Sequence, residues 1–174
     1  MKELVITLMI WIGGQTGFLI PEPPILSINT PTEIRQIMYQ CDRLKYEDAY
    51  LYDTFCIDDL NPESIDVIAV YDDDAGIIYL PTYFDMNNMA HKAILLHELI
   101  HHVQFKSGFY KKVRCRQMLE KQAYDLMDIW LEENDAVMPV DLAIGPILRF
   151  TLTTCRDNFF QSYIPEDEAQ EPVK

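Results

Sequence analysis

All four histidines of this 174-residue chain lie between His91 and His102, in a segment whose other residues are mostly apolar. Apolar residues recur at helical spacing from 88 to 106, which predicts one helix with a broad buried face. Within it, His97 and His101 are four residues apart, so their imidazoles lie one above the other on the same face. Two imidazoles placed in this way can converge on one metal ion.

The residues from His97 to His101 read His-Glu-x-x-His, a spacing that suits zinc with Zn–N distances of about 2.0–2.1 Å. Glu98 is rotated by about 100° from His97 around the helix, so it can reach a metal-bound water but is badly placed to be a ligand. We therefore expect Glu98 to be the general base that activates this water. The alternative interpretation is a core helix with exposed histidines and an accidental motif.

A third ligand must come from another segment, because one helix supplies only two at this pitch. The metzincin pattern is excluded, since Gln104 and Ser107 stand where it requires glycine and histidine. Glu120 is the best candidate, because the next predicted helix (113–133) can return its carboxylate to the metal. Asp125 and Asp128 are the alternatives, and Glu120 could instead be a solvated surface acid.

The two remaining histidines are not expected to be ligands. His102 is rotated by about 100° from His101, which favours a hydrogen bond in the core over ligation. His91 lies off the ligand face, near the start of the helix, and is predicted to be a surface residue.

The His-Glu-x-x-His motif, followed by Glu120-x-x-Ala123-Tyr124 on the next helix, resembles the gluzincin branch of zinc metallopeptidases. More narrowly, residues 77–131 resemble small, mostly uncharacterised bacterial zincin-like proteins. The resemblance implies an α+β, minimal zincin-like fold, in which a small sheet packs on the motif helix and on the third-ligand helix. It also implies one Zn²⁺ ion held by the two histidines and Glu120.

The same resemblance implies hydrolysis of peptide bonds in a peptide or protein substrate. The strand at 77–82 would edge the cleft and pair with an extended substrate. Tyr124 is our preferred donor to the developing oxyanion, although packing could be its main role, and Tyr79, Tyr83 and Arg114 are alternatives. Two other classes stay open: an inactive zincin-like protein that binds metal or a partner, and an acidic interaction protein.

The rest of the chain gives a coarse element order. Thr30 and Glu33 form a capping-box pattern with proline at the first helical position. Two β-rich runs separated by an acidic turn predict a hairpin. The expected elements are a helix at 31–44, strands at 67–71 and 77–83, and helices at 88–106, 113–133 and 142–160, the last broken near Gly145 and Pro146.

The first twenty residues raise a question of export. Lys2, an apolar run at 4–12 and a following small and polar stretch resemble a signal peptide, so we expect a periplasmic or secreted protein. The alternative is a buried first strand or helix of a cytoplasmic protein. The run is shorter than the about 20 residues that span a bilayer. Residues 21–164 are expected to form a single zincin-like domain, and 165–174 an acidic disordered tail.

Charge and cysteines limit the partners. The net charge of −14, from 28 acidic and 14 basic residues, opposes binding to nucleic acid or to an anionic membrane, so neither is expected of the mature form. The four cysteines lack the spacing of a structural zinc site. An exported chain would pair them, and Cys41–Cys56 with Cys115–Cys155 is the preferred pairing, whereas a cytoplasmic chain would keep four thiols.

Overall fold

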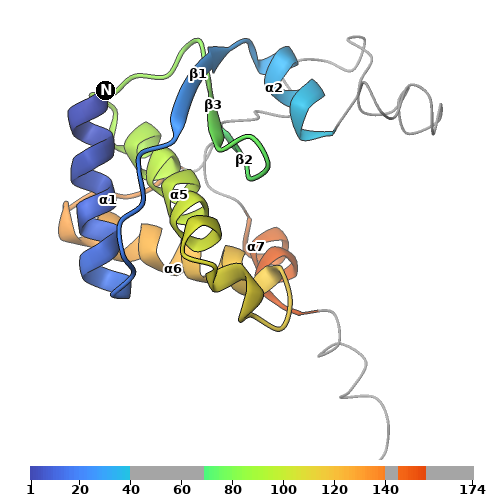
Figure 1. Ribbon diagram of the computed structural model, residues 1–174. Coiled ribbons are helices and arrows are strands. Elements are labelled where there is room, and N and C mark those ends of the chain that lie inside the picture. Colours follow the sequence, from blue (N-terminus) through green and yellow to red (C-terminus); the bar gives the residue numbers. More distant parts are fainter. Residues whose placement is uncertain (40–68, 140–144, 156–174) are drawn as a thin grey trace, which may run out of the picture.

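The computed structural model describes residues 1–39, 69–139 and 145–155 (Figure 1). In this part of the chain, helices and a small three-stranded sheet form an α+β fold, which confirms the predicted class. The elements are α1 (Lys2–Thr16), β1 (Ile25–Asn29), α2 (Pro31–Met38), β2 (Val70–Asp72), β3 (Ile77–Pro81), α5 (Met89–Lys106), the 3-10 helix η1 (Phe109–Lys111), α6 (Gln117–Glu133) and α7 (Pro146–Thr153).

Helix α5 is the central element of the fold. It contacts α1, α6, η1, β2 and β3, and its bounds agree with the predicted helix at 88–106 (Figure 1). The side chain of Asn88 caps its start by accepting hydrogen bonds from the backbone N–H groups of Ala90 and His91. Because α5 is buried on most of its surface, each polar side chain on it needs a partner.

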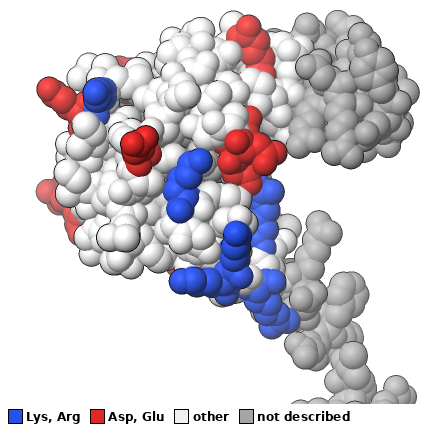
Figure 2. Space-filling view, viewed as in Figure 1, with Lys and Arg blue, Asp and Glu red and all other residues white. Residues whose placement is uncertain are grey.

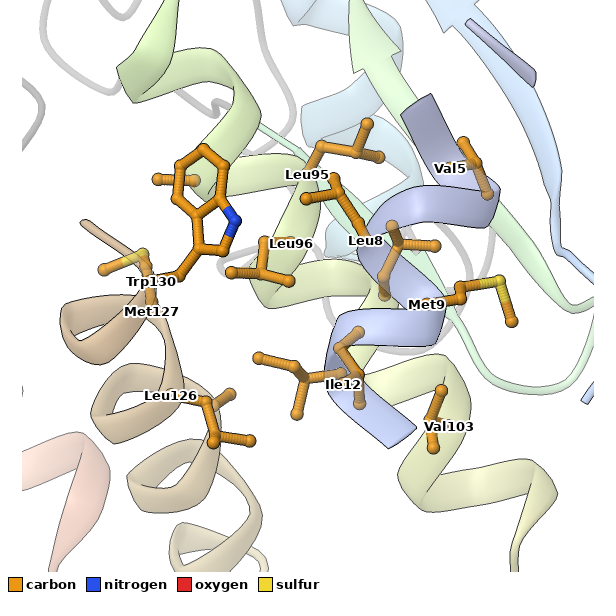
Figure 3. Close-up of a cluster of buried hydrophobic side chains, with 14 of the residues drawn as sticks. Val5, Leu8, Met9, Ile12, Leu95, Leu96, Val103, Leu126, Met127 and Trp130 are labelled. Carbon is orange, nitrogen blue, oxygen red and sulfur yellow. The ribbon is translucent and has the colours of Figure 1, made fainter. Parts of the chain in front are cut away.

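The hydrophobic core fills the space between α1, α5 and α6 (Figure 3). Leu96 and Leu99 of α5 are completely buried there, and so is Ala123 of α6. Trp130, farther along α6, packs in the same cluster. This packing fixes α6 against α5 and thereby sets the position of the residues at the start of α6.

Helix α1 belongs to this core. Val5, Leu8, Met9 and Ile12 recur at helical spacing and are buried, and the indole of Trp11 donates a hydrogen bond to a Glu133 carboxylate oxygen at 2.7 Å. The alternative expectation of a buried first helix therefore describes how these residues fold. None of the helices in the described ranges is long and apolar enough to cross a membrane. Export stays a prediction. N-terminal sequencing of the protein isolated from its native cells would test it.

The sheet has the strand order β1-β3-β2, with β1 parallel and β2 antiparallel to β3. The predicted hairpin is confirmed, and Gly76 closes its turn with a φ of 70°, a conformation that favours glycine. The prediction that the strand at 77–82 edges the cleft is wrong. Strand β1, which the sequence did not indicate, pairs with one side of β3 and leaves it in the centre of the sheet.

The start of α2 confirms the predicted capping box. Thr30 Oγ1 accepts a hydrogen bond from the Glu33 N–H, and the Glu33 carboxylate accepts one from the Thr30 N–H at 2.8 Å. Helix α2 ends at Met38, short of the predicted end at 44, and residues 40–44 lie outside the described residues. The predicted acidic tail at 165–174 lies wholly outside them, and so do the first two residues of the predicted strand at 67–71.

Two later helices begin where local chemistry allows. Helix α6 begins at Gln117 rather than at 113, because Gly108, in the left-handed conformation, leads into η1 and a turn first. Helix α7 begins at Pro146 directly after Gly145, which is where the sequence predicts a break. Helix α7 packs against α6 and so lies on the same side of the molecule as the start of that helix.

The structure pairs Cys115, just before α6, with Cys155, just after α7, as a disulfide with a Cα–Cα distance of 5.9 Å. This distance lies within the usual range for bonded cysteines. The bond would hold the end of α7 close to the start of α6. It remains a proposal for the protein in solution, and the second predicted pair, Cys41 with Cys56, lies outside the described residues.

Candidate metal centre

Three side-chain atoms converge between α5 and α6: Nε2 of His97, Nε2 of His101 and Oε2 of Glu120. The two nitrogens are 3.1 Å apart, and the carboxylate oxygen lies 3.3 Å from the first and 3.4 Å from the second. Around a tetrahedral zinc ion with bonds of about 2.0–2.1 Å, neighbouring ligand atoms are about 3.3 Å apart. The three atoms thus have the spacing of one face of a zinc coordination shell, and two imidazoles with one carboxylate suit this metal.

The position of Glu120 depends on α6. It lies in the first turn of the helix, where the helix dipole favours a carboxylate. The two alternative third ligands are not in the converging group. Asp125 pairs with Lys121, and Asp128 pairs with Arg149. The structure therefore brings together the predicted set of His97, His101 and Glu120 and leaves both substitutes outside it.

The three groups support one another's charge states. Burial opposes ionisation of Glu120, but hydrogen bonds and attraction from His101 and His97 outweigh it and hold the pKa of this carboxyl well below its usual range. Burial also opposes protonation of His101, but the bond to Glu120 and the charges of Glu120 and Glu98 outweigh it and raise its pKa. Glu120 is accordingly ionised at neutral pH, which is the form that a metal ligand requires. Metal binding must displace any proton on His101, so affinity should fall as pH falls.

Gln104 orients His101, a role that the sequence did not indicate. Its side chain is completely buried, and its Oε1 lies 2.9 Å from Nδ1 of His101. Its Nε2 donates to the Leu119 carbonyl at 3.0 Å and to the Gln122 Oε1 at 2.9 Å, which fixes the oxygen towards the imidazole. Neutral His101 then carries its proton on Nδ1 and keeps a lone pair on Nε2, as a metal ligand requires.

His97 is held by ring packing. Its imidazole lies 4.8 Å from that of His101 in an edge-to-face arrangement and 4.4 Å from the ring of Tyr124. Its Nδ1 is buried and has no hydrogen-bond partner among the described residues. The two histidines therefore differ in how the protein fixes them, since a hydrogen-bonded amide holds one and two aromatic contacts hold the other.

A cavity of about 330 Å³ opens onto the three converging atoms. Glu98 and Tyr124, the predicted base and oxyanion donor, both line it, together with Tyr71 of β2. Glu98 is half-buried, so its carboxylate is accessible from the same space as the ligand atoms. The alternative donors named above, Tyr79, Tyr83 and Arg114, are not among the described residues that line this cavity.

Tyr124 keeps its proton at neutral pH. Burial first, then the negative charges of Glu120 and Glu98, raise its pKa to about 12, while Arg149 opposes them. The guanidinium of Arg149 lies 5.2 Å from the centre of the ring. A phenol that stays protonated is a hydrogen-bond donor, which is the property required next to an oxygen that gains negative charge.

The other two histidines have structural partners. His102 is 2% exposed, and it donates from Nε2 to the Glu22 carbonyl at 2.8 Å and accepts at Nδ1 from the Tyr71 hydroxyl at 3.2 Å. The predicted hydrogen bond in the core is thereby confirmed. His91 is half-buried rather than on the surface, and its Nδ1 accepts a hydrogen bond from the Asp85 N–H ahead of α5.

Comparisons with known proteins give one family. No curated protein and no solved structure matches the chain. A family model described as "Domain of unknown function (DUF6647)" matches residues 58–154, more than half of the chain, and this range contains α5, α6 and all three converging residues. The chain therefore belongs to the DUF6647 family, and its candidate metal centre lies within the part that defines the family.

Proposed function

We propose that the protein is a zinc-dependent hydrolase that cleaves peptide bonds. The observation that supports this most is the convergence of His97, His101 and Glu120 beside Glu98 in an accessible cavity. Three protein ligands leave a coordination position for water or substrate, an arrangement typical of catalytic rather than structural zinc. When bound, the ion would polarise the substrate carbonyl and make water acidic enough to lose a proton near neutral pH.

Each residue of the site has a defined task in this proposal. The two imidazoles and the Glu120 carboxylate would hold the ion, and Gln104 keeps the Nε2 lone pair of His101 turned towards that position. Glu98 accepts the proton of the attacking water at a carboxylate oxygen and then delivers it to the nitrogen of the leaving amine. The hydroxyl of Tyr124 donates a hydrogen bond to the carbonyl oxygen as this oxygen becomes negative.

The sheet supports a peptide as substrate. In the described part of the chain, β2 pairs with β3 alone and forms one edge of the sheet. Val70 and Tyr71 of this strand line the cavity beside the metal centre. An extended peptide that hydrogen-bonds to the free edge of β2 would pass the site. The substrate would then pair with β2 and not, as the sequence leads us to expect, with the central β3.

A single substitution tests the catalytic role of Glu98. Glu98→Gln keeps the shape of the side chain but removes the base, so cleavage of a fluorogenic peptide library should fall by about 10²–10⁴-fold while zinc stays near the wild-type level. Glu132→Gln, an exposed position on α6, is the matched control. Unchanged turnover in Glu98→Gln, or loss of zinc from this variant, would contradict the role of base.

A metal-binding protein without activity is the second candidate. A fourth protein ligand that closes the coordination shell would favour it. Among the described residues the converging group has three members, which favours catalysis. X-ray absorption spectroscopy of the zinc-loaded protein tests this point, because an open site predicts one water-derived oxygen ligand and a closed site predicts none.

A further inference from the structure

Positive charge is concentrated in the segment of this acidic chain that joins the two converging histidines to Glu120. The chain has 14 basic and 28 acidic residues, yet the segment 99–119 contains no Asp or Glu. This segment carries five basic residues: Lys106, Lys111, Lys112, Arg114 and Arg116. It connects the last part of α5 with the start of α6, and Figure 2 shows blue side chains gathered in the lower part of the face that it draws. The partner of this segment is expected to be negatively charged.

Arg116 connects this positive segment to the cavity. It is the only Lys or Arg among the described residues that line the cavity, and it lies one helical turn before Glu120. No hydrogen bond or ion pair joins its guanidinium to another residue in the ranges that the structure describes, whereas Arg149 and Lys121 both pair with aspartates. A guanidinium at a cavity wall that pairs with none of the described residues is available to a ligand.

Helix stability does not account for an arginine at this position. Arg116 is the N-cap residue of α6 and makes no side-chain capping hydrogen bond. Ser, Thr, Asp and Asn are the residues that stabilise an N-cap, and a positive charge there opposes the helix dipole. The side chain is also exposed, so it contributes little to the core. A role towards a ligand explains the residue better than a role in folding.

We propose that Arg116 binds a carboxylate of the substrate, so that the preferred peptides carry a carboxylate close to the scissile bond. This inference rests on the proposed peptidase function and assigns its substrate class. The planar guanidinium can hold a carboxylate through two parallel hydrogen bonds, and the remaining basic residues of the segment attract an acidic peptide from a distance. The carboxylate can belong to an acidic side chain or to the peptide C-terminus, and the experiment separates the two.

Binding without turnover is the direct test. The zinc-loaded Glu98→Gln protein is titrated with fluorescent peptides that differ only in Glu against Gln, or in a free against an amidated C-terminus. The preferred carboxylate peptide should bind about tenfold more tightly than its neutral partner. Adding Arg116→Gln should reduce this ratio to about twofold or less and leave the neutral peptide unchanged. Lys121→Gln, on the same helix and outside the cavity lining, should keep the full ratio.

Two further measurements sharpen the result. Raising the salt concentration from about 0.05 to 0.5 M should reduce the preference for the carboxylate peptide in the protein that keeps Arg116, because exposed charges are screened. The acidic stretch at 165–174 of the same chain is the alternative ligand of Arg116 that a truncation tests. Removing this stretch should leave the preference unchanged. A tenfold gain in acidic-peptide affinity on removal would show that the tail is the occupant and would overturn the assignment to a substrate.

The failure of this proposal differs from the failure of the proposed function. Equal affinity for acidic and neutral peptides, or an unchanged ratio in Arg116→Gln, overturns the carboxylate site even if the wild-type protein cleaves peptides. Conversely, a preference that disappears in Arg116→Gln supports the site even if the wild-type protein cleaves none of the peptides. In that case only the hydrolase activity is refuted.

Discussion

Replacement of Gln104 by methionine removes the hydrogen bond that orients His101 while nearly conserving side-chain volume. In the folded protein, Gln104 Oε1 lies 2.9 Å from His101 Nδ1, and its amide group donates to Leu119 and Gln122. Methionine offers neither a comparable acceptor nor a donor, so the imidazole is free to rotate and its proton is free to move to Nε2. The ligand nitrogen would then be correctly oriented and unprotonated for only part of the time.

The size of the effect follows from these contacts. Loss of a hydrogen bond behind a metal-bound histidine typically lowers metal affinity by 10- to 100-fold, which corresponds to about 1.4–2.7 kcal/mol of binding free energy. The metal-free protein should also lose about 1–3 kcal/mol of unfolding free energy, because the buried amide of Gln104 no longer bonds to the Leu119 carbonyl and to His101. Both values are differences between Gln104→Met and wild type at the same pH.

Competition with a chromophoric zinc chelator measures the affinity, and urea denaturation measures the stability. Gln122→Met is the control, since it removes the outer amide partner and leaves the contact between Gln104 and His101 in place. Its zinc affinity should change less than that of Gln104→Met. A folded Gln104→Met protein that binds zinc with wild-type affinity would refute the orienting role of this residue.

Three other predictions concern the scaffold. Leu96→Ala, at a completely buried core position, should lower the unfolding free energy by about 2–5 kcal/mol in urea denaturation, and a loss below 1 kcal/mol would contradict the core described here. The bond between Cys115 and Cys155 spans a sequence separation of 40 residues, so it should contribute about 4 kcal/mol to the unfolding free energy. Non-reducing peptide mapping should recover the two cysteine peptides linked, and recovery of two free thiols would contradict the bond. Burial, followed by the charges of Asp73 and Asp72, raises the pKa of Tyr71 from 10.0 to about 12. The stability that the protonated phenol adds is therefore complete below pH 10 and is lost as pH rises towards 12. Tyr71→Phe should flatten that part of the stability profile, and equal slopes in both proteins would show that this phenol does not contribute.

The centre of the site was predictable because its geometry is local. The helical repeat alone sets the relation between His97 and His101, and capping by Asn88 sets the start of their helix. Glu120 required one more step, namely the return of the following helix, and the structure places its carboxylate at the two imidazoles. Each of these steps depends on residues that are close in sequence.

The surroundings of the site were harder to predict from the sequence, because they depend on contacts between distant segments. Gln104 lies three residues after His101 on α5, which is the one local signal of its role, but its amide partners are on α6. Tyr71 reaches His102 from a strand 31 residues earlier. The spacing of apolar residues does not encode such pairs, so the sequence indicates the candidate ligands and not the groups that orient them.

The error in the sheet has the same origin. Residues 25–29 follow a proline-rich stretch and are too few to show a clear alternating pattern, so the sequence did not indicate β1. The strand forms because it pairs in parallel with β3, about fifty residues later. For α1, a nearly continuous apolar run carries little information on which face is buried, and only packing against α5 selects Leu8 and Ile12 over the exposed Ile10.

The zinc content of purified protein tests the central claim most directly. After loading with zinc and removal of free ion, elemental analysis should find about one zinc per wild-type chain and a large loss in His97→Ala and in Glu120→Ala. Asp125→Asn, at a position that pairs with Lys121 outside the site, should keep the wild-type content. A wild-type protein that binds no zinc, or variants at 97 and 120 that bind as much as the wild type, would contradict the metal centre.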